Sequence, residues 1–309
     1  MTLPHSFYLY NGTVRFMRSV GMTMERVKTG MPGLDGLMEG GIPSGFNVLV
    51  VGAPGTGKTI MGLQYLCGGA KEGDIGMYVT LDSRADQVIE QGKQFDWGLE
   101  RFMAEGKVRM LEIPLNKQKR VDIFKMIEDK AKEWKVKRIV FDSLSSFIFN
   151  INQFIISLPK IDDMSKMQED LKKYIGEDPV TKQMIPEALQ KDMPDPKFYQ
   201  TGSANTEKRV VYLTLRELAK IGTTNIIITG QAQTLDSASV DGVSEFVADG
   251  VILLDVQEIA KKAVRSLQIK KLRNTKQELD KFRLEFSKSG LEVNEEKIYI
   301  GSKISGISQ

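Results

Sequence analysis

The sequence has almost none of the residues that build disulfide frameworks and zinc sites. Its 309 residues include one cysteine, Cys67, and one histidine, His5. One thiol cannot form an internal disulfide, and these two side chains cannot supply the four ligands of a structural zinc site. Cys67 lies in a run with a helical pattern, where a buried thiol packs as a small apolar side chain. We therefore expect a reducing, cytoplasmic setting.

Long apolar runs and an excess of one charge are also missing. No run approaches the roughly 18 apolar residues that a membrane span needs, so we expect no membrane partner. Lysine plus arginine total 43 against 40 acidic residues, which leaves a formal net charge of +3. A balance this close to neutral does not favour a protein that coats nucleic acid.

What the chain does contain is an alternation of short apolar runs and helical patterns. The apolar runs are rich in Val and Ile and lack strict alternation, as strands covered on both faces do. They lie at 47–51, 77–81, 108–113, 138–141, 225–229 and 251–254. Helical patterns lie between most of them, at 59–70, 85–94, 121–134 and 210–221. This order predicts an α/β fold with a mostly parallel sheet flanked by helices. Two later runs, 266–273 and 282–287, predict antiparallel strands at one edge.

The length allows one large domain or two small ones, and we predict one domain over residues 25–300. Residues 1–24 are then an N-terminal extension, expected to be mobile, and 301–309 a C-terminal tail. Residues 151–208 interrupt the alternation, because they contain no clear strand, several prolines, and ten acidic residues against eight lysines. A structureless loop of this length is unusual in a compact domain, so we expect a helical or flexible insertion.

A glycine-rich loop carries the strongest chemical signal. Gly52-x-x-x-x-Gly57-Lys58-Thr59 follows the predicted strand 47–51 and precedes a helical pattern, the context that makes this motif credible. Its glycines let backbone N–H groups surround phosphate oxygens, and the helix N-terminus adds partial positive charge. Lys58 would reach the β- and γ-phosphates of ATP, and the Thr59 hydroxyl would bind Mg²⁺. The predicted nucleotide-binding residues are Gly52, Ala53, Pro54, Gly55, Thr56, Gly57, Lys58 and Thr59.

Two acidic residues follow neighbouring predicted strands at the edge where ligands bind in open α/β sheets. Asp142 ends the run at 138–142, where it can orient Mg²⁺ or its water shell; the alternative is an N-cap for the following helix. Asp82 ends the run at 77–82 and is the candidate carboxylate that polarises water for hydrolysis. Its alternative role is a strand-end cap.

Five further stretches occur in a fixed order around the loop. They are 27–35 with 40–45, 95–99 with 105–107, 142–144, 242–250 and 267–275. Together they resemble the single-domain KaiC-like ATPases of the RecA superfamily, of archaeal type, over roughly residues 25–300. The loop motif alone indicates only a P-loop NTPase, whereas the ordered set is far more specific. The resemblance implies a RecA-like core, ATP with Mg²⁺, and a ring, usually a hexamer, with ATP between subunits.

The resemblance also implies roles for residues outside the loop. Lys271 and Arg273 would reach the γ-phosphate bound by the neighbouring subunit, where cations stabilise charge on the transferring phosphoryl group. Gln231 would sense the nucleotide state from a strand end. The alternative for Lys271 and Arg273 is that they lie on a solvated face of a strand. The alternative for Gln231 is an ordinary loop amide.

The chain departs from the KaiC-like pattern in three ways. Asp82-Ser83 stands where these enzymes typically carry a Glu pair. Aspartate is one methylene shorter, and a misplacement of about 1 Å can cost about 10²-fold in rate, so we expect slow hydrolysis. The chain has one such domain where clock KaiC has two, and the phosphorylated Ser/Thr pair has no clear counterpart, so no autokinase or clock role is carried over. The segment 151–208 is also longer than its family equivalent.

Three functions fit these observations. The first is a regulatory oligomeric nucleotide switch with an unidentified protein partner. The second is a recombinase-like or DNA repair accessory ATPase. Its DNA would lie on the acidic segment 151–208 and on 232–243, which contains no Lys or Arg, so DNA binding is disfavoured. The third is a non-hydrolysing nucleotide scaffold, favoured if Asp82 proves inert.

Overall fold

The computed structural model of this chain describes residues 7–10, 13–16, 24–115, 120–154, 203–231, 244–259 and 262–298. Most of the predicted insertion lies outside these residues, although its two ends belong to helices α5 and α9. The loop 232–243 and the tail 301–309 lie outside them as well. Within the predicted N-terminal extension, two strands pair as an antiparallel hairpin, β1 (Phe7–Tyr10) and β2 (Thr13–Phe16).

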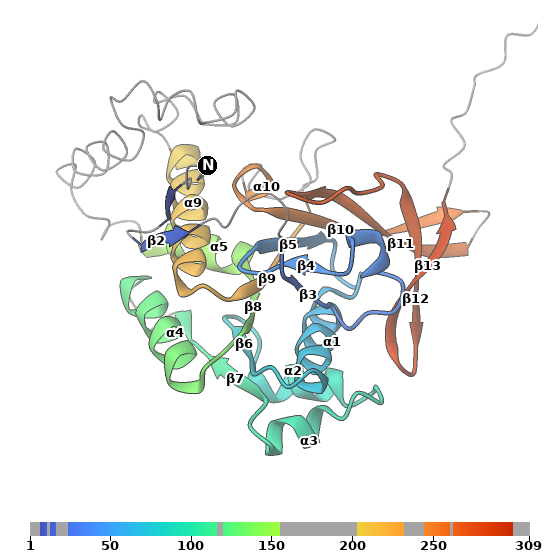
Figure 1. Cartoon of the computed structure of the whole chain (residues 1–309), viewed down its shortest axis with the longest axis horizontal. Helices are drawn as coiled ribbons and strands as arrows, with labels where there is room; N and C mark the ends of the chain where they lie inside the picture. The colour runs from blue at the N-terminus through green and yellow to red at the C-terminus, as the bar shows by residue number, and fades with distance from the viewer. Residues whose placement is uncertain are drawn as a thin grey trace, which may run out of the picture.

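A nine-stranded sheet crosses the molecule, in the order β13-β12-β11-β10-β5-β9-β8-β6-β7 (Figure 1). The strands from β10 to β7 in this order pair in parallel. Every residue of β5, β6 and β9 is buried, which explains why their sequences are continuous apolar runs rather than alternating ones. The parallel strands beside β10 are β5 (Asn47–Gly52), β9 (Thr224–Thr229), β8 (Arg138–Asp142), β6 (Gly76–Thr80) and β7 (Val108–Glu112).

The last four strands form the antiparallel edge that the sequence predicts. They are β10 (Gly250–Ile259), β11 (Lys262–Leu272), β12 (Lys281–Ser287) and β13 (Gly290–Lys297). Strand β10 belongs to both parts of the sheet, because it pairs in parallel with β5 and antiparallel with β11. A small separate sheet, β3 (Arg26–Val27) with β4 (Ile42–Pro43), and a 3-10 turn η1 (Gly36–Met38) precede β5.

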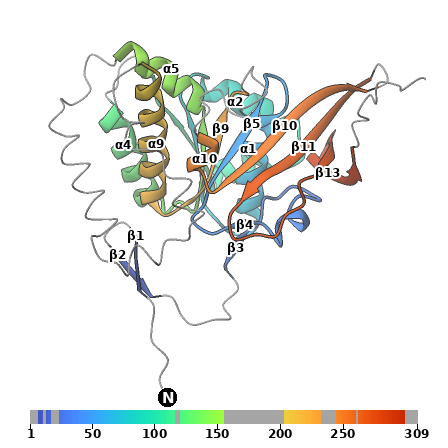
Figure 2. The ribbon, with the colours of Figure 1, turned by 90° about the horizontal axis from the view of Figure 1, so that it is seen from above.

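Helices cover both faces of the sheet, as Figures 1 and 2 show. Val48 and Val50 of β5 pack into one core cluster with α1, while Leu49 and Val51 pack into the other with α4, α5 and α9. The side of α1 carries α1 (Lys58–Lys71), α2 (Ala85–Gly92) and α3 (Leu99–Ala104). The other side carries α4 (Arg120–Trp134), α5 (Leu144–Phe154), α9 (Ser203–Ile221) and the short α10 (Ser244–Val247).

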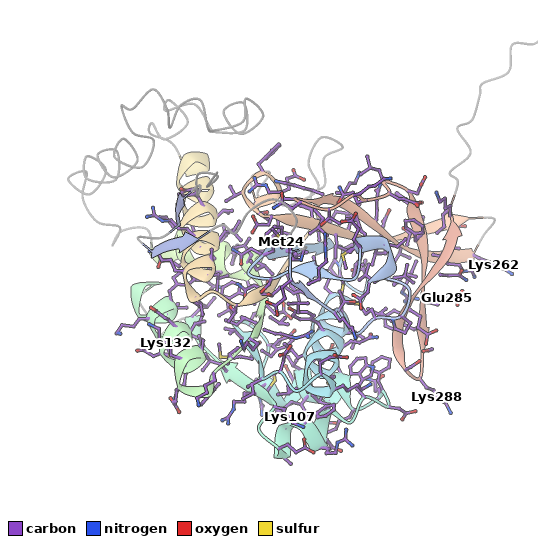
Figure 3. All side chains as sticks on the ribbon, in the orientation of Figure 1. Met24, Lys107, Lys132, Lys262, Glu285 and Lys288 are labelled. Atoms are coloured by element: carbon purple, nitrogen blue, oxygen red, sulfur yellow. The ribbon has the colours of Figure 1, made fainter. Side chains whose placement is uncertain are left out.

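Most charged side chains lie outside this layered interior, and the buried Arg138 is paired with Asp74. In Figure 3 the labelled lysines stand at the periphery, and Lys132, Lys262 and Lys288 are exposed. In the part of the chain that the structure describes, no helix is both long and apolar enough to span a membrane. The architecture is therefore the three-layer α/β fold that the alternation of patterns predicts.

Candidate functional site

The glycine-rich loop joins the end of β5 to the start of α1. Gly55 and Gly57 have φ angles of 81° and 106°, a region that side chains with a Cβ rarely adopt. Gly52 has no space for a side chain, since an added Cβ would lie 2.6 Å from both the Leu254 carbonyl oxygen and the Thr56 hydroxyl. The motif's glycines are therefore required by the backbone path of the loop.

Lys58 is the first residue of α1 and folds back over the loop. Its Nζ donates to the carbonyl oxygens of Gly52, at 2.7 Å, and Ala53, at 2.9 Å. Burial lowers the pKa of Lys58, and the Asp142 carboxylate opposes that shift. The loop thus combines an ammonium group with the N-terminus of a 14-residue helix, which favours a bound anion.

Asp142 lies at the end of β8 and accepts two hydrogen bonds on Oδ2. One comes from the Thr59 hydroxyl at 3.2 Å, and the other from the hydroxyl of the buried Tyr78. Burial raises the pKa of Asp142, and the Tyr78 and Thr59 hydrogen bonds oppose that rise. The peptide bond between Asp142 and Ser143 is cis. Ser143, rather than Asp142, caps α5, because its Oγ accepts from the Ser146 N–H at 3.2 Å.

These donors fit magnesium. The Thr59 hydroxyl and the Asp142 carboxylate are hard oxygen ligands, and Mg²⁺ in nucleotide sites takes one or two protein ligands plus waters and phosphate oxygens. The prediction of Thr59 and Asp142 as metal ligands is consistent with their contact, and it stays a prediction.

Asp82 follows β6 and is exposed. Its Oδ1 accepts from the Ser83 N–H at 3.1 Å, and its Oδ2 accepts from the Ser146 hydroxyl at 2.5 Å. The bond from the Ser83 N–H is local, as expected if Asp82 were only a strand-end cap. The N-terminus of α2 is capped differently, since Glu112 accepts from the Ala85 N–H at 2.8 Å.

A cavity of about 500 Å³ joins these groups, a volume in the usual range for small-molecule sites. It is lined by the loop, by both carboxylates and by the first turn of α5, including Gly52, Lys58, Thr59, Asp82, Asp142 and Ser146. Gly230, after β9, also lines it, and Gln231 is the next residue. The sensor role of Gln231 stays a prediction.

Three residues of this site were missed by the sequence analysis. Tyr78 sits in an apolar run that reads as core, and no local pattern reveals its contact with Asp142. Ser146 stands three residues after Ser143, a spacing that could have indicated a helix cap. Phe286 of β12 lines the cavity, and an added Cβ on Gly57 would lie 2.9 Å from its Cζ.

Lys271 and Arg273 do not lie at this cavity. Gly250 pairs with Leu272 on one side and with Val48 on the other, and Val48 is four positions before Gly52 along β5. At a rise of about 3.3 Å per residue, Lys271 and Arg273, which we call the finger, lie roughly 13 Å along the strands from the loop. They are therefore at the opposite edge of the sheet, where the parallel strands begin. Their partners are at that edge too: Lys271 donates to the Phe246 carbonyl at 3.0 Å, and Arg273 pairs with Asp249 at 3.4 Å.

Comparisons with known proteins show which chains this one resembles. The family model described as "ATPase: KaiC" matches residues 27–154 and 156–298. A UPF0273 protein of Methanopyrus kandleri is 30% identical over 281 residues, covering 90% of this chain and 96% of that protein. A UPF0273 protein of Pyrococcus horikoshii is 31% identical over 280 residues, covering 90% of this chain and 98% of that protein.

Two further comparisons concern a KaiC protein and a KaiC-like protein. The circadian clock oscillator protein KaiC of Prochlorococcus marinus is 24% identical over 270 residues, and the match covers 84% of this chain but only 43% of that protein. A crystal structure of a KaiC-like protein from Pyrococcus horikoshii superposes with a TM-score of 0.63 at 28% identity, covering 88% of this chain and 100% of that one.

Proposed function

The chain belongs to the KaiC family of ATPases, and on that premise we propose that it is an oligomeric, ATP-dependent switch with slow hydrolysis. The observation that carries the proposal is the meeting of Lys58, the Thr59–Asp142 pair and Asp82 around one cavity. Loop N–H groups and Lys58 would hold the β- and γ-phosphates, and Thr59 with Asp142 would hold Mg²⁺, which neutralises phosphate charge.

Asp82 is the proposed acceptor of the proton from the attacking water. It is exposed at the cavity, and it lies near enough to Asp142 for its charge to raise the pKa of that group. The aspartate side chain is short compared with a glutamate, and a general base must come within about 3 Å of the water oxygen whose proton it takes. Slow turnover is therefore expected, because water must approach the strand end closely.

The oligomer is inferred from the two opposite edges of the sheet. Lys271 and Arg273 cannot reach the loop of their own chain, but a neighbouring copy could bring its loop to them. Such a contact joins two different surfaces head to tail, and this kind of interface closes into a ring when the rotation allows it. We propose a hexamer with ATP between subunits, so that nucleotide state controls assembly and an unidentified protein partner responds to it.

A non-hydrolysing nucleotide scaffold is the second candidate function. It is favoured by one observation, namely that both oxygens of Asp82 already accept hydrogen bonds from protein groups. The recombinase-like alternative has no such support among the described residues, because 232–243 and most of 151–208 lie outside them.

The test measures particle mass and phosphate release with and without ATP and Mg²⁺. Wild type should form larger particles with ATP and release phosphate slowly. Asp82→Asn should keep nucleotide binding and assembly while its turnover falls by about 10²-fold or more, as expected for loss of a general base. Assembly without phosphate release, unchanged by Asp82→Asn, would favour the scaffold. A salt-dependent shift of DNA by the purified protein would revive the recombinase-like function.

A further inference from the structure

The start of α5 presents a row of serine hydroxyls beside Asp82. From their contacts we propose that Ser146 is a positioning residue, which holds the Asp82 carboxylate in the orientation that hydrolysis needs. This inference rests on the proposed function, because it assigns a role to the partner of a carboxylate that acts on water. Ser146 lines the same cavity as Asp82, and its Oγ donates to Asp82 Oδ2 at 2.5 Å.

The hydrogen bonds of the row run in one direction. Ser143 Oγ donates to Ser146 Oγ at 2.8 Å, and Ser146 Oγ donates to Asp82. A serine hydroxyl has one proton, so Ser143 must accept in its 3.2 Å contact with Ser145. The chain therefore runs from Ser145 through Ser143 and Ser146 to the carboxylate. Such an arrangement suits an ionised acceptor at its end, since hydrogen bonds to a charged group are the stronger ones.

Ser146 also connects two separate elements of the fold. The Asp82 carboxylate also accepts a hydrogen bond from the adjacent Ser83 N–H, which ties it only to its own loop. Ser146 ties it to α5, whose N-cap Ser143 directly follows Asp142. The contact thereby sets the spacing between the carboxylate that would act on water and the one that would hold Mg²⁺.

This spacing matters for the hydrolytic step. The oxygen of water bonds to the γ-phosphorus, and the bond from that phosphorus to the bridging oxygen breaks, its electron pair leaving with ADP. The proton of the water passes to Asp82 and then to the released phosphate or to solvent. A displacement of about 1 Å in such a group can cost about 10²-fold in rate, and an exposed aspartate with two rotatable bonds needs an outside contact to stay in place.

The experiment compares wild type with Ser146→Ala and Ser146→Thr. Ser146→Ala should lower kcat by about tenfold while the Kd for ATP stays within about twofold, because Ser146 acts through Asp82 and not on the phosphates. It should weaken binding of ADP with aluminium fluoride, a planar mimic of the transferring group, by about tenfold, as expected for a contact made in the transition state. Ser146→Thr keeps the hydroxyl and should restore kcat to within about threefold of wild type.

Asn150→Ala is the matched control. Asn150 lies one turn later on α5 and donates to the Ser146 carbonyl at 2.8 Å, so its loss disturbs the same helix without touching Asp82. It should leave kcat unchanged. In an Asp82→Asn background, Ser146→Ala should cause no further loss, since residues acting through one another are not additive.

The outcomes separate this inference from the proposed function. Wild-type kcat in Ser146→Ala overturns the inference alone, as does a kcat loss that Ser146→Thr does not restore. A loss accompanied by weaker ATP binding and a lower melting temperature also overturns it, because this indicates a structural role. Phosphate found on Ser146 by mass spectrometry would show an acceptor instead of a positioning group. A wild-type protein that neither hydrolyses ATP nor binds ADP with aluminium fluoride overturns the proposed function itself.

Discussion

Lys58, Asp142 and Asp82 meet around a single cavity at the edge of the central sheet where its parallel strands end. At the opposite edge, where these strands begin, Lys271 and Arg273 contact carbonyls and a carboxylate of their own chain. The difference comes from strand direction. Parallel strands β5, β8 and β6 end at the same edge, so the residues that follow them converge. Strand β11 runs antiparallel to β10, so its last residues lie beside Gly250, the first residue of β10. Lys271 and Arg273 are therefore at the edge where the parallel strands begin.

The carboxyl ends of the parallel strands therefore carry the residues of the proposed nucleotide site, whereas Lys271 and Arg273, at the amino ends, could act on a nucleotide only if a second copy brought one to them. The Arg273–Asp249 pair is partly exposed, with side-chain exposures of 34% and 27%. Pairs of this kind contribute about 0–1 kcal/mol, so Arg273 can leave Asp249 at little cost. In the proposed ring, Arg273 would exchange this weak pair for the γ-phosphate of a neighbouring subunit.

The largest expected effect comes from breaking the finger. Arg273→Ala should lower turnover by about 10³-fold, the lower range for an arginine that acts on a transferring phosphoryl group. Mixing it with Lys58→Ala should restore activity, because about a quarter of interfaces in a random equal mixture combine an intact loop with an intact finger. Single-turnover phosphate release measures this recovery. Two inactive variants that stay inactive when mixed would place the finger outside the reaction.

The next largest effect is expected at the glycine-rich loop. Lys58→Ala should weaken ATP binding by about 100-fold or more, because it removes the ammonium group that hydrogen-bonds across the loop. Calorimetry with Mg²⁺ present measures the affinity. Lys71→Ala, in the last turn of the same helix, is the control and should bind ATP as wild type does. Equal affinities in both variants would contradict the assignment of the loop.

A smaller effect tests how the magnesium carboxylate is held. Tyr78→Phe removes the hydroxyl that donates to Asp142, leaving Thr59 as a donor. The Mg²⁺ concentration for half-maximal nucleotide binding should rise by about tenfold, as is typical when a residue supporting a metal ligand is lost. Tyr65→Phe is matched to it, since this buried hydroxyl donates to the Thr224 carbonyl instead. An unchanged Mg²⁺ requirement would show that Tyr78 only fills space.

The smallest effect concerns Asp249, beneath the finger. Burial raises the pKa of this carboxyl above its ordinary value of 3.8, so its contribution to stability is full below that value and is lost as pH rises through the folded pKa. Asp249→Asn keeps an oxygen for the Asn47 N–H and should change the unfolding free energy by less than about 1 kcal/mol near neutral pH. Urea denaturation between acid and neutral pH should show a weaker pH dependence in the variant. An identical dependence would contradict the shift.

Several elements follow from sequence with little error. The pattern at 47–51 corresponds to β5, and the helical pattern at 121–134 corresponds to α4. The predicted strand 251–254 is too short, because β10 continues to Ile259 through polar residues. Its extension beyond β5 pairs with β11, for example Gln257 with Val264, so the partner strand supplies hydrogen bonds that the residues' own polarity does not predict.

The glycine-rich loop can be predicted from the local sequence alone. Glycine spacing, a preceding apolar run and a following helix are local features, and each has one physical meaning at the end of a buried strand. The contacts that complete the site are different in kind. Thr59 and Asp142 are 83 positions apart, and Ser146 and Asp82 are 64 apart, so packing of the sheet and α5 had to bring them together. Only that packing decided which hydroxyl holds each carboxylate and which edge the finger occupies.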